Sequence, residues 1–201
     1  MTDGITRREF LKGTGAVITG VAMLDQGMTA AEGAPAAAAA AKGAESGGRR
    51  ILHVNGMKRA VQVEPQMTLA EVLRGPLDLT GTKIGCDRGA CSACTVWIDG
   101  APVLSCMTLA LDVGEGKVVT IEGLARREKL HPVQSAFIAH DAIQCGFCTP
   151  GLVMSCAALL ERNPNPSRDD VTAAIAGHLC RCGTAPHVLD AALDAAKAMK
   201  G

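Results

Sequence analysis

GCDRGACSACTV, residues Gly85 to Val96, is the stretch that decides how this chain folds. It holds Cys86, Cys91 and Cys94 in the spacing Cys-x4-Cys-x2-Cys, and Cys106 follows further along the chain. Cysteines this close in sequence, with glycines between them, are typical of a loop that wraps around a bound inorganic group.

The spacing of these four cysteines is the plant-type [2Fe-2S] pattern. Two irons need four thiolates that converge from a tightly wound loop, so that backbone amides can donate hydrogen bonds to the sulfurs. Gly85 and Gly89 are expected to permit that winding. A structural zinc site and a pair of disulfides are the alternatives, although zinc cysteines usually come as paired knuckles.

The segments around this loop predict short strands and one helix. Asn55-Gly56 joins two β-rich runs and Asp99-Gly100 joins two more, and both dipeptides favour tight hairpins. A capping box at 68–71 predicts a short helix, and KVVTIEG at 117–123 predicts a last strand. This order predicts an α+β module and resembles the β-grasp of plant-type ferredoxins.

The second half has helical periodicity. Apolar residues recur every three or four positions in four runs, which cover 135–143, 152–163, 168–179 and 187–200. Helix boundaries are indicated by Pro132, Thr149-Pro150, Asn163-Pro164 and a capping box at 167–170. The pattern predicts a small bundle of four helices.

The bundle carries Cys145 and Cys148 in one motif and Cys180 and Cys182 in another. Cys-x2-Cys alone fits a redox dithiol or half a zinc site equally well. Together with Cys-x-Cys and the first module, it predicts a second two-iron site. Cys156 lies on the apolar face of a predicted helix and is expected to be a buried small hydrophobe rather than a ligand.

Composition limits the remaining choices. The chain has 201 residues, a hydrophobic content of 48%, an aromatic content of 2% and a formal net charge of zero. A core with so few aromatic side chains is thin, so each small module is expected to need metal to hold it together. The balanced charge does not favour nucleic acid or an anionic membrane surface as a partner.

Residues 1–30 read as a twin-arginine export signal. Arg7 and Arg8 precede Phe10, Leu11 and a modest apolar run that is too short to span a membrane. An Ala/Gly-rich linker is expected over 31–48. We therefore expect a periplasmic protein that is exported already folded, with its metal in place.

Three motifs in this order resemble the iron-sulfur subunit of the xanthine oxidase family of molybdenum hydroxylases, in particular the small subunit of bacterial aldehyde and isoquinoline oxidoreductases. They are GCDRGACSACTV at 85–96, QCGFCTPG at 144–151 and HLCRCGT at 178–184. Where relatives commonly read GQCGAC, this chain has Ala90 and Ser92 in place of an amide side chain and a glycine.

The resemblance implies a β-grasp [2Fe-2S] domain over 49–123 and an all-α [2Fe-2S]-binding domain over 124–201. It implies one cluster on Cys86, Cys91, Cys94 and Cys106, and a second on Cys145, Cys148, Cys180 and Cys182. It also implies that Gln144 lies near the molybdopterin of a separate large subunit. No residue of this chain is expected to be catalytic, because the oxidative hydroxylation takes place at molybdenum in the partner.

The expected function is electron transfer from the molybdopterin centre through two [2Fe-2S] clusters to an FAD subunit or to a cytochrome c. No glycine-rich dinucleotide loop follows a strand in this chain, so flavin and pterin are expected only in partner subunits. A disulfide-stapled periplasmic binding protein and an independent soluble ferredoxin are the competing hypotheses.

Overall fold

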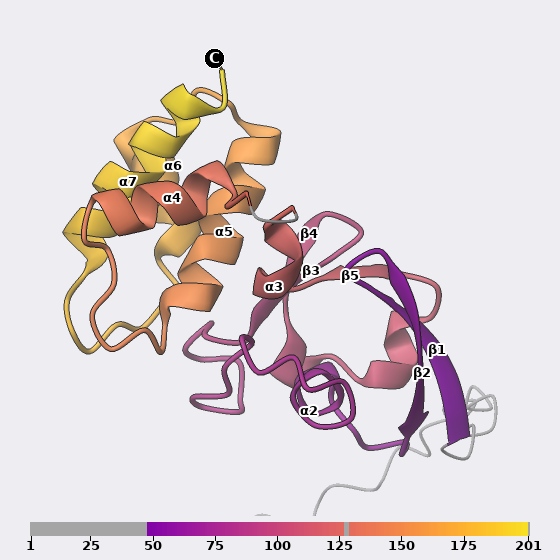
Figure 1. The fold of residues 1–201 in the computed structure, drawn as a ribbon. Helices are drawn as coiled ribbons and strands as arrows, with labels where there is room; N and C mark the ends of the chain where they lie inside the picture. Colours follow the sequence, from indigo (N-terminus) through magenta and orange to yellow (C-terminus); the bar gives the residue numbers. More distant parts are fainter. Residues whose placement is uncertain (1–47, 127–128, 201) are drawn as a thin grey trace, which may run out of the picture. The chain divides into compact units, whose positions relative to one another are not determined.

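The computed structural model describes residues 48–126 and 129–200. The predicted twin-arginine segment lies outside these residues, as does the linker up to residue 47. The described part begins with a five-stranded sheet and continues into helices (Figure 1). This order agrees with the predicted α+β class.

The sheet has the strand order β2-β1-β5-β3-β4. Its strands are β1 (Gly48–Val54), β2 (Met57–Val63), β3 (Thr95–Ile98), β4 (Ala101–Leu104) and β5 (Lys117–Val119). β1 and β5 pair in parallel, whereas the other neighbours are antiparallel. The last strand therefore lies in the middle of the sheet and joins the two hairpins.

Both hairpins turn at the dipeptides that predict them. Asn55 and Gly56 have φ values of 51° and 76°, and Asp99 and Gly100 have φ values of 50° and 79°. Positive φ at both central residues matches the right-handed twist of the flanking strands, which makes a two-residue connection possible.

One helix of the first module packs against the sheet. α2 (Leu69–Arg74) begins at the predicted capping box, in which the Thr68 hydroxyl accepts from the Glu71 N–H and the Glu71 carboxylate accepts from the Thr68 N–H. Its buried Leu69, Val72 and Leu73 form one apolar cluster with residues of the strands. Burial of each such side chain stabilises the fold by roughly 1.5–3 kcal/mol.

The second half contains the four expected helices. They are α4 (Pro132–Ala139), α5 (Thr149–Arg162), α6 (Arg168–Ile175) and α7 (Ala185–Ala198), preceded by the one-turn α3 (Ile121–Leu124). Two short 3₁₀ segments, Ser105–Met107 and Ala110–Val113, connect β4 to β5. Figure 1 shows α4 lying along α7, with α5 between the other helices and β3.

Besides α4 and α6, which end before the predicted runs do at 143 and 179, two boundaries differ from the prediction. The strand predicted over 117–123 ends at Val119, and residues 121–124 turn into α3 instead. Thr149 was expected to cap α5, but it is the first helical residue, and the position before the helix is occupied by Cys148. In both places a tertiary contact competes with the local pattern, since the end of β5 and the start of α5 each adjoin the other module.

The two modules share part of one core. The single tryptophan, Trp97 of β3, belongs to the buried cluster of the helical module, and its Nε1–H donates to the Met154 carbonyl oxygen at 2.9 Å. A buried indole needs such a partner for its N–H, and here α5 provides it. Among the described residues, no helix has the length and hydrophobicity that a membrane crossing needs.

Candidate metal centres

The first cysteine loop is wound by residues with left-handed backbone. Asp87, Gly89 and Ser92 have φ values of 52°, 73° and 57°. The winding turns the Ala90 N–H toward the Cys86 sulfur at a distance of 3.1 Å. Backbone N–H groups of Arg88 and Ala90, together with the neighbouring Cys91, lower the pKa of Cys86 to about 7. The loop therefore already favours a thiolate at this position.

Cys94 and Cys106 form a buried pair on the inner side of the same loop. Ser105, which precedes Cys106 in the first 3₁₀ segment, donates from its N–H and its hydroxyl to the Cys94 carbonyl oxygen, at 3.3 and 2.7 Å. Burial raises the pKa of Cys94 to about 11, and the neighbouring Cys106 thiol contributes. Two thiols held this close out of water are suited to share one metal atom.

Gly85 has a different role from the one expected. Its backbone is not left-handed, so rotational freedom is not what the position requires. A Cβ placed there would stand 3.1 Å from the Cys91 sulfur and 3.3 Å from Cε1 of Phe147. The absence of a side chain at Gly85 therefore leaves room for the thiol and for an aromatic ring from the second module.

The second cysteine site lies between the N-terminus of α5 and the segment before α7. Cys148 occupies the position before α5, where the helix dipole favours negative charge. Burial and the neighbouring Cys180 thiol raise the pKa of Cys148 to about 12. For Cys180, burial acts in the same direction, but the Thr184 hydroxyl, 3.2 Å away, and backbone N–H groups outweigh it and lower its pKa to about 7.

The two outer cysteines complete this second group. Cys145 is exposed and close enough to Cys148 to influence its ionisation, and the Cys182 backbone N–H points toward the Cys180 sulfur. Gln144, the residue expected near a pterin, is exposed immediately before Cys145. The site is therefore buried on the Cys148 side and open to solvent on the Cys145 side.

The donor set fits two-iron clusters. All nine cysteines are free thiols, and the motifs predict that eight of them form two groups. Within the described ranges, no three His, Cys, Asp or Glu side chains converge on a point that could hold a single ion. The thiols stand in pairs instead, Cys86 with Cys91, Cys94 with Cys106 and Cys148 with Cys180. A [2Fe-2S] cluster takes two thiolates on each iron, which suits pairs.

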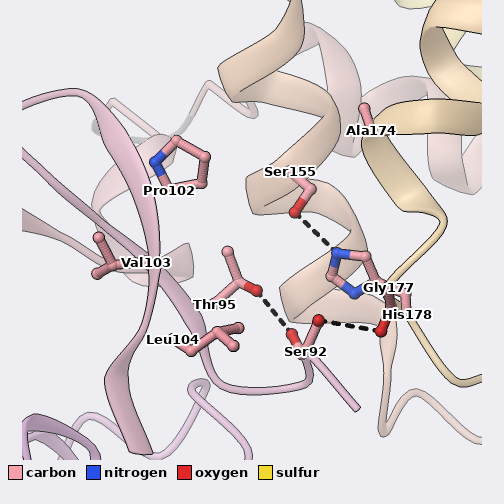
Figure 2. A pocket seen from close by; sticks show the side chains of 9 residues that line it. All are labelled: Ser92, Thr95, Pro102, Val103, Leu104, Ser155, Ala174, Gly177 and His178. Atoms are coloured by element: carbon pink, nitrogen blue, oxygen red, sulfur yellow. Dashed lines mark hydrogen bonds between the residues drawn. The ribbon is translucent and has the colours of Figure 1, made fainter. Parts of the chain in front are cut away.

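Direct hydrogen bonds join the two cysteine loops. The Leu179 N–H donates to the Cys91 carbonyl oxygen at 3.3 Å, and the Ser92 hydroxyl donates to the Gly177 carbonyl oxygen at 3.0 Å. Leu179 is the residue before Cys180, so one hydrogen bond connects a cysteine of the first site to the neighbour of a cysteine of the second. Figure 2 shows the Ser92 contact beside a pocket of about 190 Å³ between the two modules.

His178 lies at the helical wall of this pocket. Its Nε2 is 2.8 Å from the Ser155 hydroxyl of α5 (Figure 2). Burial lowers the pKa of His178 to about 4, so the imidazole is neutral at physiological pH. It fastens the segment that carries Cys180 to α5.

Three residues of this arrangement make contacts that the sequence motifs do not indicate. Ser92 and Phe147 act across the boundary between the modules, whereas His178 joins two segments of the helical module. Ser92 and Phe147 carried a signal, Ser92 as a departure from the motif of the relatives and Phe147 as an aromatic between two expected ligands. Cys156 is fully buried in α5, and burial raises its pKa to about 12, as expected for a core thiol.

Comparison with known proteins identifies both modules. Residues 52–118 match the 2Fe-2S iron-sulfur cluster binding domain, and residues 120–193 match the [2Fe-2S] binding domain. The two matches follow each other with almost no gap and cover the β-grasp and the helical part in turn. They confirm the predicted fold class.

Relatives in other organisms match most of this chain. The nicotine 6-hydroxylase small subunit of Paenarthrobacter nicotinovorans is 48% identical over 72% of this chain and 87% of that protein. The aldehyde oxidoreductase iron-sulfur-binding subunit PaoA of Escherichia coli is 36% identical over 98% of this chain and 90% of that protein. A chain of quinoline 2-oxidoreductase from Pseudomonas putida 86 superposes with a TM-score of 0.73 at 45% identity, over 76% of this chain and 95% of that chain. With both cysteine sites built as described and identity of this extent, the chain belongs to the small iron-sulfur subunits of the xanthine oxidase family of molybdenum hydroxylases.

Proposed function

We propose that this chain is the electron-transfer subunit of an exported molybdenum hydroxylase that oxidises an aldehyde or an N-heterocycle. It takes electrons from a molybdopterin-bearing large subunit and delivers them to a flavin subunit or a cytochrome. The names of its relatives support the substrate class, since they include a nicotine hydroxylase, an aldehyde oxidoreductase and a quinoline oxidoreductase.

The hydrogen bond between the two cysteine loops is the observation that carries the proposal. When bound, a [2Fe-2S] cluster accepts and releases single electrons. The protein connects the two sites from Cys91, across its carbonyl oxygen to the Leu179 N–H, and on to Cys180. A short path of covalent bonds and one hydrogen bond is what a relay between two centres requires, whereas a protein with two unrelated metal sites has no need of it.

The exposure of Gln144 and Cys145 supports an assignment of direction. The second site is open to solvent there, while Cys94 and Cys106 of the first site are buried. An open edge allows a redox group of another subunit to approach closely. We infer that the molybdopterin of the large subunit docks at this edge, with Gln144 beside it.

Separate cysteine substitutions test the assignment of the two sites. Cys91→Ser and Cys148→Ser should each remove one of two reducible spin-resonance signals and spare the other, because each takes one ligand from a different group. Cys156→Ser is the matched control and should retain both signals. Loss of both signals in either ligand variant would point to one shared site and would overturn the relay.

Purification distinguishes a subunit from a free ferredoxin. The chain expressed with its neighbouring genes should copurify with a large molybdenum-containing polypeptide. A preparation that holds both clusters, remains monomeric and never associates with molybdenum would favour an independent ferredoxin.

Export is testable through the paired arginines. The match to the E. coli subunit covers 98% of this chain and so extends into the first 47 residues, where the paired arginines stand. Replacing Arg7 and Arg8 together by lysine should keep the protein in the cytoplasm with its clusters intact. Periplasmic recovery of this double variant would contradict twin-arginine export.

A further inference from the structure

Phe147 of the second cysteine motif contacts the first cysteine loop, and the motifs alone do not indicate this contact. Phe147 lies between Cys145 and Cys148, two of the expected ligands of the second site. Its ring nevertheless reaches the other module, where Cε1 lies 3.3 Å from the point at which a Gly85 Cβ would stand. The Cys91 sulfur lies 3.1 Å from that same point. One side of Gly85 is therefore filled by the ring and the thiol together.

We propose that Phe147 is a positioning residue for the first site, where its ring covers the Cys91 sulfur and keeps water from it. This inference rests on the proposed function, since it requires a cluster on the first loop. The ring is supplied by the motif of one site and acts on the other, so it also links the environments of the two sites.

The exposure of the ring supports a covering role. Phe147 is 48% exposed, so roughly half of it is turned to solvent and the other half lies against the protein. The chain has an aromatic content of only 2%. An aromatic side chain that is partly exposed leaves apolar surface in contact with water, which is unfavourable. Its Cε1 lies against Gly85, on the side of that residue where the Cys91 sulfur also lies.

The backbone of Gly85 adds to this conclusion. Its backbone does not need glycine, but a methyl group at this position would press on the thiol and on the ring at distances tighter than ordinary van der Waals contact. The loop thus omits a side chain at a place that both the ring and the sulfur adjoin.

The ring is expected to lower the reduction potential of the first site. Reduction adds a negative charge to the thiolate-bound group, and water near the sulfurs stabilises that charge. Excluding water from Cys91 therefore disfavours the reduced form. Removing the ring should raise the potential of the first site more than that of the second.

A redox titration of the complete iron-loaded protein, followed by spin resonance, tests this. In Phe147→Ala, the signal that Cys91→Ser abolishes should move to higher potential, and in Phe147→Leu it should move by a smaller amount. Ile138→Ala is the matched control, because Ile138 of α4 is an apolar side chain that is 62% exposed, and it should leave both signals in place.

Two outcomes would overturn the inference. One is an unchanged first-site potential in a fully loaded Phe147→Ala protein. The other is a shift that is larger in the second site, which would mean that the substitution acts through Cys145 and Cys148. Absence of both signals from the native protein would instead overturn the proposed function.

A stability measurement tests the contact without using potentials. Gly85→Ala should lower the thermal unfolding midpoint, and it should do so by less in the Phe147→Ala background, since the added methyl group then no longer meets the ring. Equal losses in the two backgrounds would show that ring and loop do not touch, and would contradict the proposal.

Discussion

Ser92 occupies a position that suits glycine better. Of the six non-glycine residues with positive φ in the described part, five are Asn or Asp, which tolerate this conformation, and the sixth is Ser92 at 57°. Its hydroxyl gains the hydrogen bond to the Gly177 carbonyl oxygen in return. Ser92, which departs from the glycine common in relatives, thus makes a contact between the modules.

Two substitutions separate the backbone cost from the hydrogen bond. Ser92→Ala keeps the left-handed backbone and loses the bond, so it should lower the free energy of unfolding by about 1 kcal/mol. Ser92→Gly also loses the bond but relieves roughly 1 kcal/mol of backbone strain, so its stability should stay close to native. Denaturant unfolding of both variants measures the difference, and equal stability of the two would contradict it.

His131 makes the stability of α4 depend on pH. Its Nδ1 accepts the Val133 N–H at 3.3 Å, which requires an unprotonated ring. Burial lowers the pKa of His131 below its usual 6.5, with Arg126 adding to the effect and Glu161 opposing it. Because the unfolded chain binds the proton more readily, this contribution is complete above pH 6.5 and is lost as the pH falls from there through the folded-state pKa.

A cap that does not titrate isolates this effect. His131→Asn can accept the same N–H at any pH. Between pH 7 and pH 5, the native protein should lose more unfolding free energy than the variant, as measured by urea denaturation at a series of pH values. Parallel pH profiles would show that His131 is not the group responsible.

At the scale of elements, much of the fold could be predicted because its signals are local. Asn55-Gly56 and Asp99-Gly100 set both hairpins, and Thr68 and Ser167 begin their helices with complete capping boxes. Each of these depends on residues within four positions of one another. The spacing of the cysteines likewise predicts two groups of four, and the pairs Cys86 with Cys91, Cys94 with Cys106 and Cys148 with Cys180 lie within them. The full groups of four stay a prediction.

The elements that could not be predicted depend on distant partners. Nothing near Val119 indicates that the strand ends there, and nothing near Thr149 indicates that Cys148 precedes the helix. The bond between Trp97 and Met154 spans 57 positions, and that between Ser92 and Gly177 spans 85. Contacts of this range are set by packing of whole elements, which local preference does not encode.

The attachment of β3 to α5 is testable through Trp97. Trp97→Phe removes the indole N–H that the Met154 carbonyl oxygen accepts and leaves a gap in the helical core. The free energy of unfolding should fall by about 1–3 kcal/mol. Thermal unfolding followed by circular dichroism measures the loss, and Ile51→Ala on the exposed face of β1 should cost much less.

At the scale of the whole molecule, the two modules are held together near their cysteines. Trp97, Ser92 and Cys91 of the first module all make contacts across the boundary, and the residues they meet lie on α5 or between α6 and α7. The cores on either side are rich in alanine and valine and contain Phe137 and Trp97 as their only aromatics among the described residues. Metal bound at both loops would stiffen the region on which this junction depends.

Removal of iron should therefore loosen the junction more than the distant ends. Apoprotein prepared with a chelator should unfold at a lower temperature than the loaded protein. Its amide exchange should increase most in residues 85–94 and 177–184, while β1 and β2 stay protected. Uniform loss of protection along the chain would mean that metal supports the whole fold rather than the junction.

The buried indole at this junction also gives the protein a built-in optical reporter. The chain has one tryptophan and no tyrosine, so nearly all of its intrinsic ultraviolet emission originates from Trp97. Coloured iron centres nearby would quench that emission, and separation of β3 from α5 would restore it and move it to longer wavelength as the ring meets water. A single fluorescence trace can therefore follow both loss of the cofactor and parting of the modules, without a label or a mutation.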